Sequence, residues 1–157
     1  MELTIRQGTA EDLDQLLRLY HDYHNGLLEV GMNYDLHEEA LPRVMQTRLR
    51  SRLILTAVAE DENGNLQGFV FCSILRLAPE YLCRGESRVG YLNDLYVAPE
   101  ARHQGLARKL TAYAESWLRE QGVKVMELQV LGKNANAQEF WKQQAMEPIG
   151  ILCCKYL

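Results

Sequence analysis

The fold of this chain is decided by one stretch, Tyr91-Leu92-Asn93-Asp94-Leu95-Tyr96-Val97-Ala98-Pro99-Glu100-Ala101-Arg102-His103-Gln104-Gly105-Leu106-Ala107-Arg108-Lys109-Leu110. Its apolar first part predicts a strand, which Pro99 ends because proline cannot donate a further ladder hydrogen bond. From Gln104 onward the spacing predicts an amphipathic helix, since apolar residues recur at Leu106, Leu110, Tyr113, Ala114, Trp117 and Leu118. The stretch therefore predicts a strand, a tight turn and a helix.

Small and basic residues meet at the joint between this strand and this helix. Gly105 and Ala107 leave room for a ligand to approach the first backbone N–H groups of the helix, which lack intrahelical acceptors. Basic side chains crowd the same turn, at Arg102, His103, Arg108 and Lys109. Guanidinium groups match phosphate oxygens in geometry, so the turn predicts a pocket for an anion such as a diphosphate.

The other elements follow from periodicity and turn residues. We expect strands over residues 2–7, 53–60, 66–77, 123–130 and 149–157, the second and third joined by an Asn-Gly turn. Helices are expected after Thr9, over roughly residues 38–50, after Gln104, and after Gly132 through Phe140 and Trp141, with loops at 25–41 and 78–88. This order predicts one α+β domain, residues 1–157, with a mixed, mostly antiparallel sheet of six to seven strands and about four helices.

Composition narrows the function. The chain has 157 residues and a net charge of −4, which argues against a nucleic-acid partner. Its apolar runs are too short to span a membrane and it begins as a strand, so we expect a soluble, cytoplasmic protein with reduced cysteines. Residues 1–45 carry nine acidic residues against three basic ones, which suits a cationic substrate beside an anionic cofactor.

Four ring-bearing residues end the first helix, at Tyr20, His21, Tyr23 and His24. They could line a substrate entrance or form a surface cluster at a helix terminus, and we favour the surface cluster. No spacing of His, Cys or carboxylate residues indicates a metal site.

Two motifs resemble those of the GNAT superfamily of N-acetyltransferases. Arg102-x-x-Gly105-x-Ala107 is similar to its pyrophosphate loop, and Asn134-x-x-Ala137-x-x-x-Trp141-x-x-x-Ala145-Met146 is similar to a second motif about 30 residues later. The resemblance covers nearly the whole chain. It implies three α/β/α layers, with a central pair of parallel strands that splay apart.

The resemblance also implies a cofactor site for acetyl-CoA. The pantetheine arm would pair with the backbone of Leu95, Tyr96 and Val97, and Asn134 would steady the cofactor unless it merely caps a helix. The diphosphate would lie on the turn formed by Arg102, His103, Gln104, Gly105, Leu106, Ala107 and Arg108. Trp141 stands where many members have a tyrosine that protonates the leaving thiolate, and an indole N–H cannot give up its proton at neutral pH.

The reaction implied is acetyl transfer to a primary amine, on a small molecule or a peptide. The nearest base candidates are Asn93, through a water, and Asp94, which strand alternation places on opposite faces. The alternatives are an acyl-CoA sensor that has lost turnover, with Trp141 as its mark, and a different nucleotide-binding protein. The closing strand, with Ile151, Cys153 and Tyr156, could pair with a second copy or with an edge of its own sheet.

Overall fold

The computed structural model describes residues 1–157 and contains one five-stranded sheet in the order β1-β2-β3-β4-β5. The strands are β1 (Leu3–Gln7), β2 (Ile54–Asp61), β3 (Leu66–Arg76), β4 (Arg88–Val97) and β5 (Met126–Glu127). The helices are α1 (Leu13–Leu28), α2 (Leu41–Arg50), α3 (Leu106–Glu120) and α4 (Ala135–Gln143), with 3-10 turns at Ala10–Asp12 and Pro99–Ala101. β1 to β4 pair antiparallel, and β4 pairs parallel with β5.

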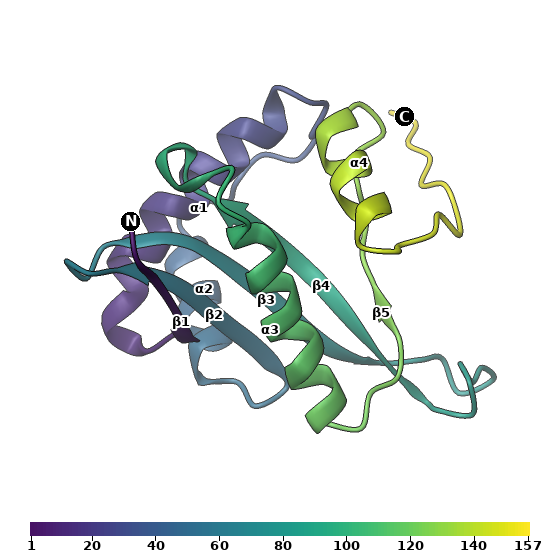
Figure 1. Cartoon of the computed structure of the whole chain (residues 1–157). Coiled ribbons are helices and arrows are strands. Elements are labelled where there is room, and N and C mark those ends of the chain that lie inside the picture. The colour runs from purple at the N-terminus through teal and green to yellow at the C-terminus, as the bar shows by residue number, and fades with distance from the viewer.

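Helices cover both faces of this sheet, with α3 in front and α1 and α2 behind in Figure 1. Strand alternation sends Leu55, Ala57 and Ala59 toward α3, and Val58, Phe69 and Phe71 toward α1 and α2. α3 packs very close to β4, because a Cβ at Gly90 would lie 2.5 Å from Leu118 Cδ1. The expected α+β class and three layers are confirmed, and so is the number of helices.

A β-bulge interrupts β4 at Asn93. Asp94 lies opposite Phe71 and Leu92 lies opposite Cys72, so Asn93 is an extra residue without a partner on β3. Leu92 and Leu95 therefore both pack on the α3 side, although they are three residues apart. The side chains of Asn93 and Asp94 both lie on the α1 and α2 side, so the expectation that they occupy opposite faces was wrong.

The sheet has five strands where six to seven were expected. The expected strand 123–130 reduces to Met126–Glu127, because its pairing with β4 ends at Tyr91, just before the bulge. The expected strand 149–157 has no regular structure and every one of its residues is exposed. Its apolar composition favours a strand, but that preference needs a neighbouring strand to pack against.

The first helix extends to Leu28, and the loop before α2 is correspondingly shorter than expected. Arg6 on β1 binds both Asp12, at the start of α1, and Glu60 on β2. This network holds α1 against the sheet edge. None of the helices has the length and apolar character needed to cross a bilayer.

Candidate active site

The β4 edge that faces β5 is free of backbone pairing beyond Tyr91. The two strands pair only at Gly90 with Met126 and at Tyr91 with Glu127. The expected pair of splayed parallel strands is confirmed. From the bulge onward, backbone groups on this edge can accept an added extended chain.

The turn after β4 exposes backbone donors. Gly105 precedes α3 with φ of +74°, and a Cβ built on it would have no atom within 4 Å. No side chain caps α3, so the N–H groups of Leu106, Ala107 and Arg108 have no acceptor within the protein. The Leu106 side chain is buried in the core, so this residue can contribute only its backbone N–H. His103, Gln104, Arg108 and Lys109 are exposed around the turn.

Arg102 makes a contact within the protein, which leaves its two Nη groups without a partner. Its Nε donates to the carbonyl oxygen of Val97 at 2.9 Å, and its guanidinium lies 5.9 Å from the centre of the Tyr96 ring. Arg102 therefore closes the turn, and the Val97 carbonyl already has a partner. Leu95 keeps its place on the open edge. The expectation for Tyr96 was wrong: the Ala98 N–H donates to the Gln67 carbonyl, and alternation then turns the backbone groups of Tyr96 toward β3 as well.

Asn93 and Asp94 are held by hydrogen bonds on the α1 and α2 side of the sheet. Ser73 Oγ donates to Asn93 Oδ1 at 2.6 Å. Asp94 Oδ2 accepts from Arg48 Nη1 at 2.9 Å and from the Tyr20 hydroxyl at 3.3 Å. Asp94 Oδ1 has no partner in the protein, so one oxygen of a fixed carboxylate stays available.

A pocket of about 150 Å³ opens at this carboxylate. It is lined by Tyr20, Tyr23, His24, Leu27, Met32, Tyr34, Asp35, Leu36 and Asp94. Burial and then the Asp94 charge raise the pKa of Tyr20 to about 12, and the same two causes raise the pKa of Tyr23 further. Both phenols are therefore neutral near pH 7. Aromatic faces beside two carboxylates make a site suited to an organic cation.

The favoured interpretation of the aromatic and histidine residues was wrong for three of the four. Tyr20, Tyr23 and His24 line the pocket, whereas His21 lies outside it with its side chain 42% exposed. The sequence does carry a signal for this difference. Tyr20 and His24 are four residues apart and so share one face of α1, while His21 is turned away from that face.

His24 lies in the wall of this pocket, although its position in the sequence indicated no role beyond membership of the aromatic and histidine cluster. The side chain is 92% buried, and its Nε2 lies 2.7 Å from the carbonyl oxygen of Tyr34. A carbonyl only accepts, so Nε2 carries the proton and Nδ1 keeps its lone pair. Nδ1 has no hydrogen-bond partner in the protein, which leaves a free ring nitrogen in the wall of the pocket.

The second motif occupies the start and the middle of α4. Asn134 Oδ1 accepts from the backbone N–H of Ala137 at 3.1 Å, so this residue caps the helix. Trp141 is buried in the core beside Phe140, with ring centres 4.8 Å apart, and its indole N–H donates to no protein atom. Trp141 thus serves as a core aromatic residue with an unused donor.

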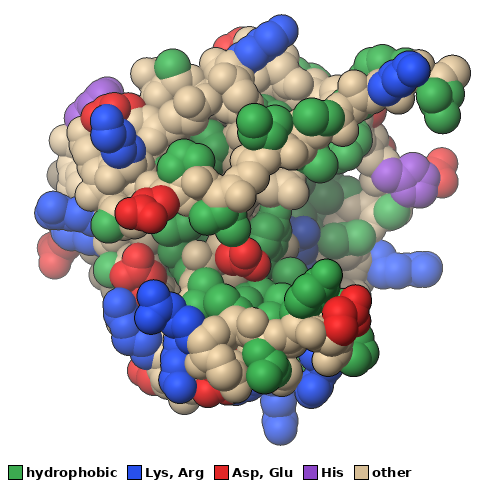
Figure 2. Space-filling view, turned by 90° about the vertical axis from the view of Figure 1, so that its right-hand side faces the viewer, with side chains coloured by type: hydrophobic (Ala, Val, Ile, Leu, Met, Phe, Trp, Pro, Cys, Tyr) green, Lys and Arg blue, Asp and Glu red, His purple; other side chains and the backbone are tan.

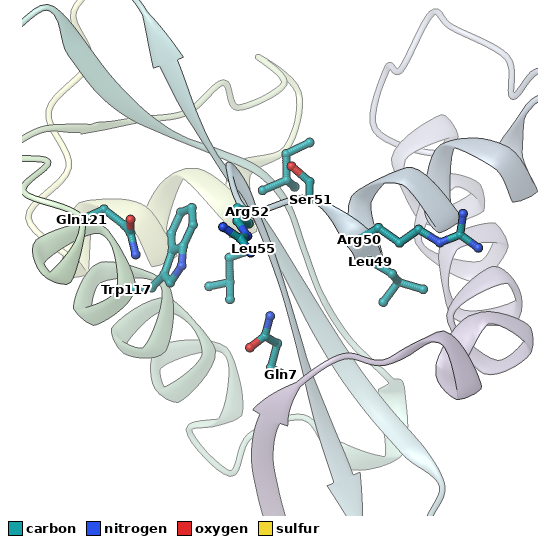
Figure 3. A pocket seen from close by; sticks show the side chains of 9 residues that line it. Gln7, Leu49, Arg50, Ser51, Arg52, Leu55, Trp117 and Gln121 are labelled. Atoms are coloured by element: carbon teal, nitrogen blue, oxygen red, sulfur yellow. The ribbon is translucent and has the colours of Figure 1, made fainter.

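A larger pocket, about 360 Å³, lies away from these groups. In Figure 3, Gln7, Leu55, Trp117 and Gln121 border the gap between α3 and the sheet, and Arg50 extends away from it. Trp117 follows Gly105 by twelve residues, which places the two about 18 Å apart along α3. None of the residues that line this pocket lines the smaller pocket at Asp94 or belongs to the turn before α3.

Comparison with known proteins shows which family this fold and this site belong to. The model of the acetyltransferase (GNAT) family matches residues 13–146. The chain belongs to the GNAT family. Among curated GNAT relatives, an uncharacterized N-acetyltransferase of Bacillus subtilis, YhfO, is 27% identical over 92% of this chain and 90% of its own. An uncharacterized N-acetyltransferase of Archaeoglobus fulgidus is 25% identical over 90% of this chain and 91% of its own.

Solved GNAT structures share the fold. A tetramutant of the BH1408 protein of Bacillus halodurans has a TM-score of 0.83 at 22% identity, over 98% of this chain and 99% of its own. The aminoglycoside N-acetyltransferase AAC(6')-Iy, solved with a bisubstrate analogue that contains CoA, has a TM-score of 0.80 at 18% identity, over 100% and 99% of the two chains. At these identities the likeness concerns the fold.

Proposed function

We propose that the protein is an N-acetyltransferase that moves an acetyl group from acetyl-CoA to a primary amine. One observation carries the proposal: Asp94 lies both in the wall of the cation-suited pocket and in the part of β4 whose opposite edge is unpaired. A donor lying along that edge and an amine lying in that pocket would meet at the bulge.

The residues of the turn fit a CoA diphosphate. The space around Gly105 is open, and the free N–H groups of Leu106, Ala107 and Arg108 point outward at a positive helix terminus. His103 and Arg108 supply cationic or donor side chains, while Arg102 holds the turn in place. The pantetheine arm would use the open edge at the backbone of Leu95 and at the N–H of Val97, whose carbonyl already accepts from Arg102. Asn134, already a helix cap, has its amide nitrogen free for a contact.

The pocket sets the size of the acceptor group. Its volume of about 150 Å³ holds roughly five water-sized groups, taking about 30 Å³ for each. It therefore accepts the amine-bearing end of a substrate, and the rest of the molecule stays outside. The phenol faces and the free Asp94 oxygen would hold that end while it is still an ammonium ion.

Deprotonation is the costly step for such an amine. An aliphatic ammonium with a pKa of about 10.4 loses its proton at pH 7 at a cost of about 4.6 kcal/mol, against about 1 kcal/mol for an α-amine. His24 Nδ1 would take that proton. The amine nitrogen then attacks the thioester carbonyl, the carbon–sulfur bond breaks, and CoA leaves as the thiolate. The nitrogen loses its second proton to solvent as the amide forms, and the thiolate can take up a proton from solvent to give free CoA.

In this proposal Asn93 and Asp94 do not accept the proton but support the reaction. Asp94, with Arg48 and Tyr20 on one oxygen, orients the ammonium through the other. Asn93 accepts a hydrogen bond from Ser73, and this hydrogen bond stabilises the bulge. Trp141 can donate a hydrogen bond to the departing sulfur, and the thiolate, with a pKa of about 8.5, can leave without a general acid at some loss of rate.

A sensor that binds acyl-CoA without turnover is the second candidate, and Trp141 in place of an acidic donor favours it. Calorimetry with acetyl-CoA, CoA and ADP, followed by thiol release over a panel of primary amines, separates the two. We expect micromolar binding of CoA and thiol release with at least one amine. Binding without release above background from any amine would support the sensor.

Gly105→Glu is the variant for the cofactor site, because it places a carboxylate at the turn. Gly85→Glu is its matched control: Gly85 also has a positive φ, +79°, and open space around it. We expect the first variant to lose CoA binding and the second to keep it. Equal loss in both would show that strain, and not the diphosphate, is responsible.

A further inference from the structure

The larger pocket lies where β1 ends and β2 continues alone. Gln7 is the last residue of β1, and Gly8 after it donates from its backbone N–H to the Thr56 carbonyl at 2.8 Å. β2 begins two residues before Thr56, at Ile54. Alternation therefore turns the backbone groups of Ile54 toward the same edge, where no strand lies beside them. With α3 on one side and the end of α2 on the other, this gap forms a cavity of about 360 Å³.

The lining of this pocket is basic. It includes Arg50 and Arg52 and no acidic side chain, in a chain whose net charge is −4. Neither guanidinium has an ion pair within the chain, whereas Arg48, on the same stretch, has one. Arg88, which donates to the Gln121 carbonyl at 2.9 Å, adds a third guanidinium beside the pocket. Charged side chains of both signs lie around the hollow that Figure 2 shows on another face, so a purely basic lining is a particular feature of this pocket.

Hydrogen-bond donors and an aromatic ring meet in this pocket. The backbone N–H of Arg52 has no acceptor in the chain, and that of Ile54 faces the open edge. Trp117 packs partly against the core, and its indole N–H donates to no protein atom. In Figure 3 the Trp117 ring and the Arg52 side chain border the same gap beside Leu55. A guanidinium fork and backbone N–H groups match a carboxylate, while an indole ring packs well against another aromatic ring.

We propose that this pocket binds a small aromatic carboxylate, with the carboxylate on Arg52 and the ring against Trp117. The cavity corresponds to about twelve water-sized groups, taking about 30 Å³ for each, which suits one or two fused rings with an acidic substituent. The side-chain amides of Gln7 and Gln121 would hold polar substituents on that ring. The pocket shares no residue with the site at Asp94, so the proposal does not depend on the acetyl transfer proposed above.

Titration of the full chain with naphthoate, followed through the indole N–H signals in proton–nitrogen NMR, tests this site. The chain has two tryptophans, and Trp117→Phe identifies the signal of Trp117. We expect naphthoate to shift that signal saturably. Naphthamide, which has the same shape without the charge, and inorganic phosphate, which has charge without a ring, should shift it little at the same concentration. No saturable shift with naphthoate, or an equal shift with either of the other two probes, would overturn the proposal.

Two arginine variants locate the carboxylate. Arg52→Gln should raise the dissociation constant of naphthoate by roughly tenfold or more, because the amide keeps polarity but loses the charge and the fork. Arg43→Gln is the matched control, since this arginine is also exposed and lies at the start of α2, outside the pocket. Far-UV circular dichroism checks that both variants are folded. Equal affinity in the two variants would overturn the proposal, as would displacement of naphthoate by CoA, which would place the probe in the cofactor site.

Discussion

Arg48 on α2 and Asp94 on β4 form an ion pair, with Arg48 Nη1 2.9 Å from Asp94 Oδ2, inside the layer that separates the helices from the sheet. Their side chains are only 19% and 12% exposed. The Arg48 guanidinium also lies 4.6 Å from the centre of the Phe71 ring. The pair joins the helical wall of the pocket to the strand that carries the bulge.

Replacing Arg48 should therefore damage both stability and amine binding. We expect Arg48→Met to lower the free energy of unfolding by about 1–3 kcal/mol, because Asp94 would stay largely buried without its cationic partner. Urea unfolding measures this loss. Arg50→Met on the same helix is the control, and its exposed side chain should change stability by less than about 0.5 kcal/mol. Equal effects in the two variants would contradict the assignment.

His24→Gln tests the proposed proton acceptor. A glutamine amide can still donate to the Tyr34 carbonyl, but it has no lone pair basic enough to take the amine proton. We expect kcat/KM for the amine to fall about 10²–10⁴-fold near pH 7, with the KM for acetyl-CoA unchanged. His21→Gln, outside the pocket, should leave the rate unchanged.

The pair formed by His21 and Glu38 should stabilise the fold more in acid than in alkali. The hydrogen bond that the ring donates to the Glu38 carboxylate, followed by the one to the Leu17 carbonyl, raises the pKa of His21 above its usual value. A raised pKa gives stability that is complete below about pH 6.5 and is lost as the pH rises through the folded-state value. The pair is exposed, so the effect should stay below about 1 kcal/mol. Melting curves of Glu38→Gln should differ from the parent at pH 5.5 and coincide with it at pH 8.5.

Asp12 should behave in the opposite way. The hydrogen bonds from Arg6 hold the pKa of this carboxyl below its usual range, against the effect of burial. A lowered pKa gives stability that is present above about pH 4 and is lost as the pH falls through the folded-state value. We expect Asp12→Asn to cost about 1–3 kcal/mol at pH 7 and much less near pH 2. A cost that stays constant from pH 7 to pH 2 would contradict this role.

Periodicity predicted the elements that pack by regular repeats. The strands around Val58, Phe69 and Leu95 and the helix that carries Leu110 and Leu118 lie where their apolar spacing placed them. The motif at Gly105 located the turn, since a left-handed residue before a helix is a local feature.

Features that depend on distant partners could not be predicted. The bulge at Asn93 is set by the register against Phe71 and Cys72, and no glycine marks it. The place of His24 in the pocket depends on the loop after α1, in which the carbonyl oxygen of Tyr34, ten residues later, forms a hydrogen bond with His24 Nε2. The segment 149–157 has the composition of a strand, but a strand also requires an edge within reach.

Because of the bulge, the side to which each side chain on β4 points depends on the number of residues between it and Leu92, and on whether the bulge forms. With Asn93 present, Leu95 and Val97 face α3 and Tyr96 faces α1 and α2. Deleting Asn93 would remove the bulge and leave Leu92 opposite Cys72 and Asp94 opposite Phe71, so all three side chains would keep their sides. A strand that kept Asn93 and alternated strictly from Leu92 would instead turn all three to the opposite sides. Substitutions within the strand change individual contacts, whereas pairing Asn93 as an ordinary strand residue would exchange the lining of the substrate side for that of the core.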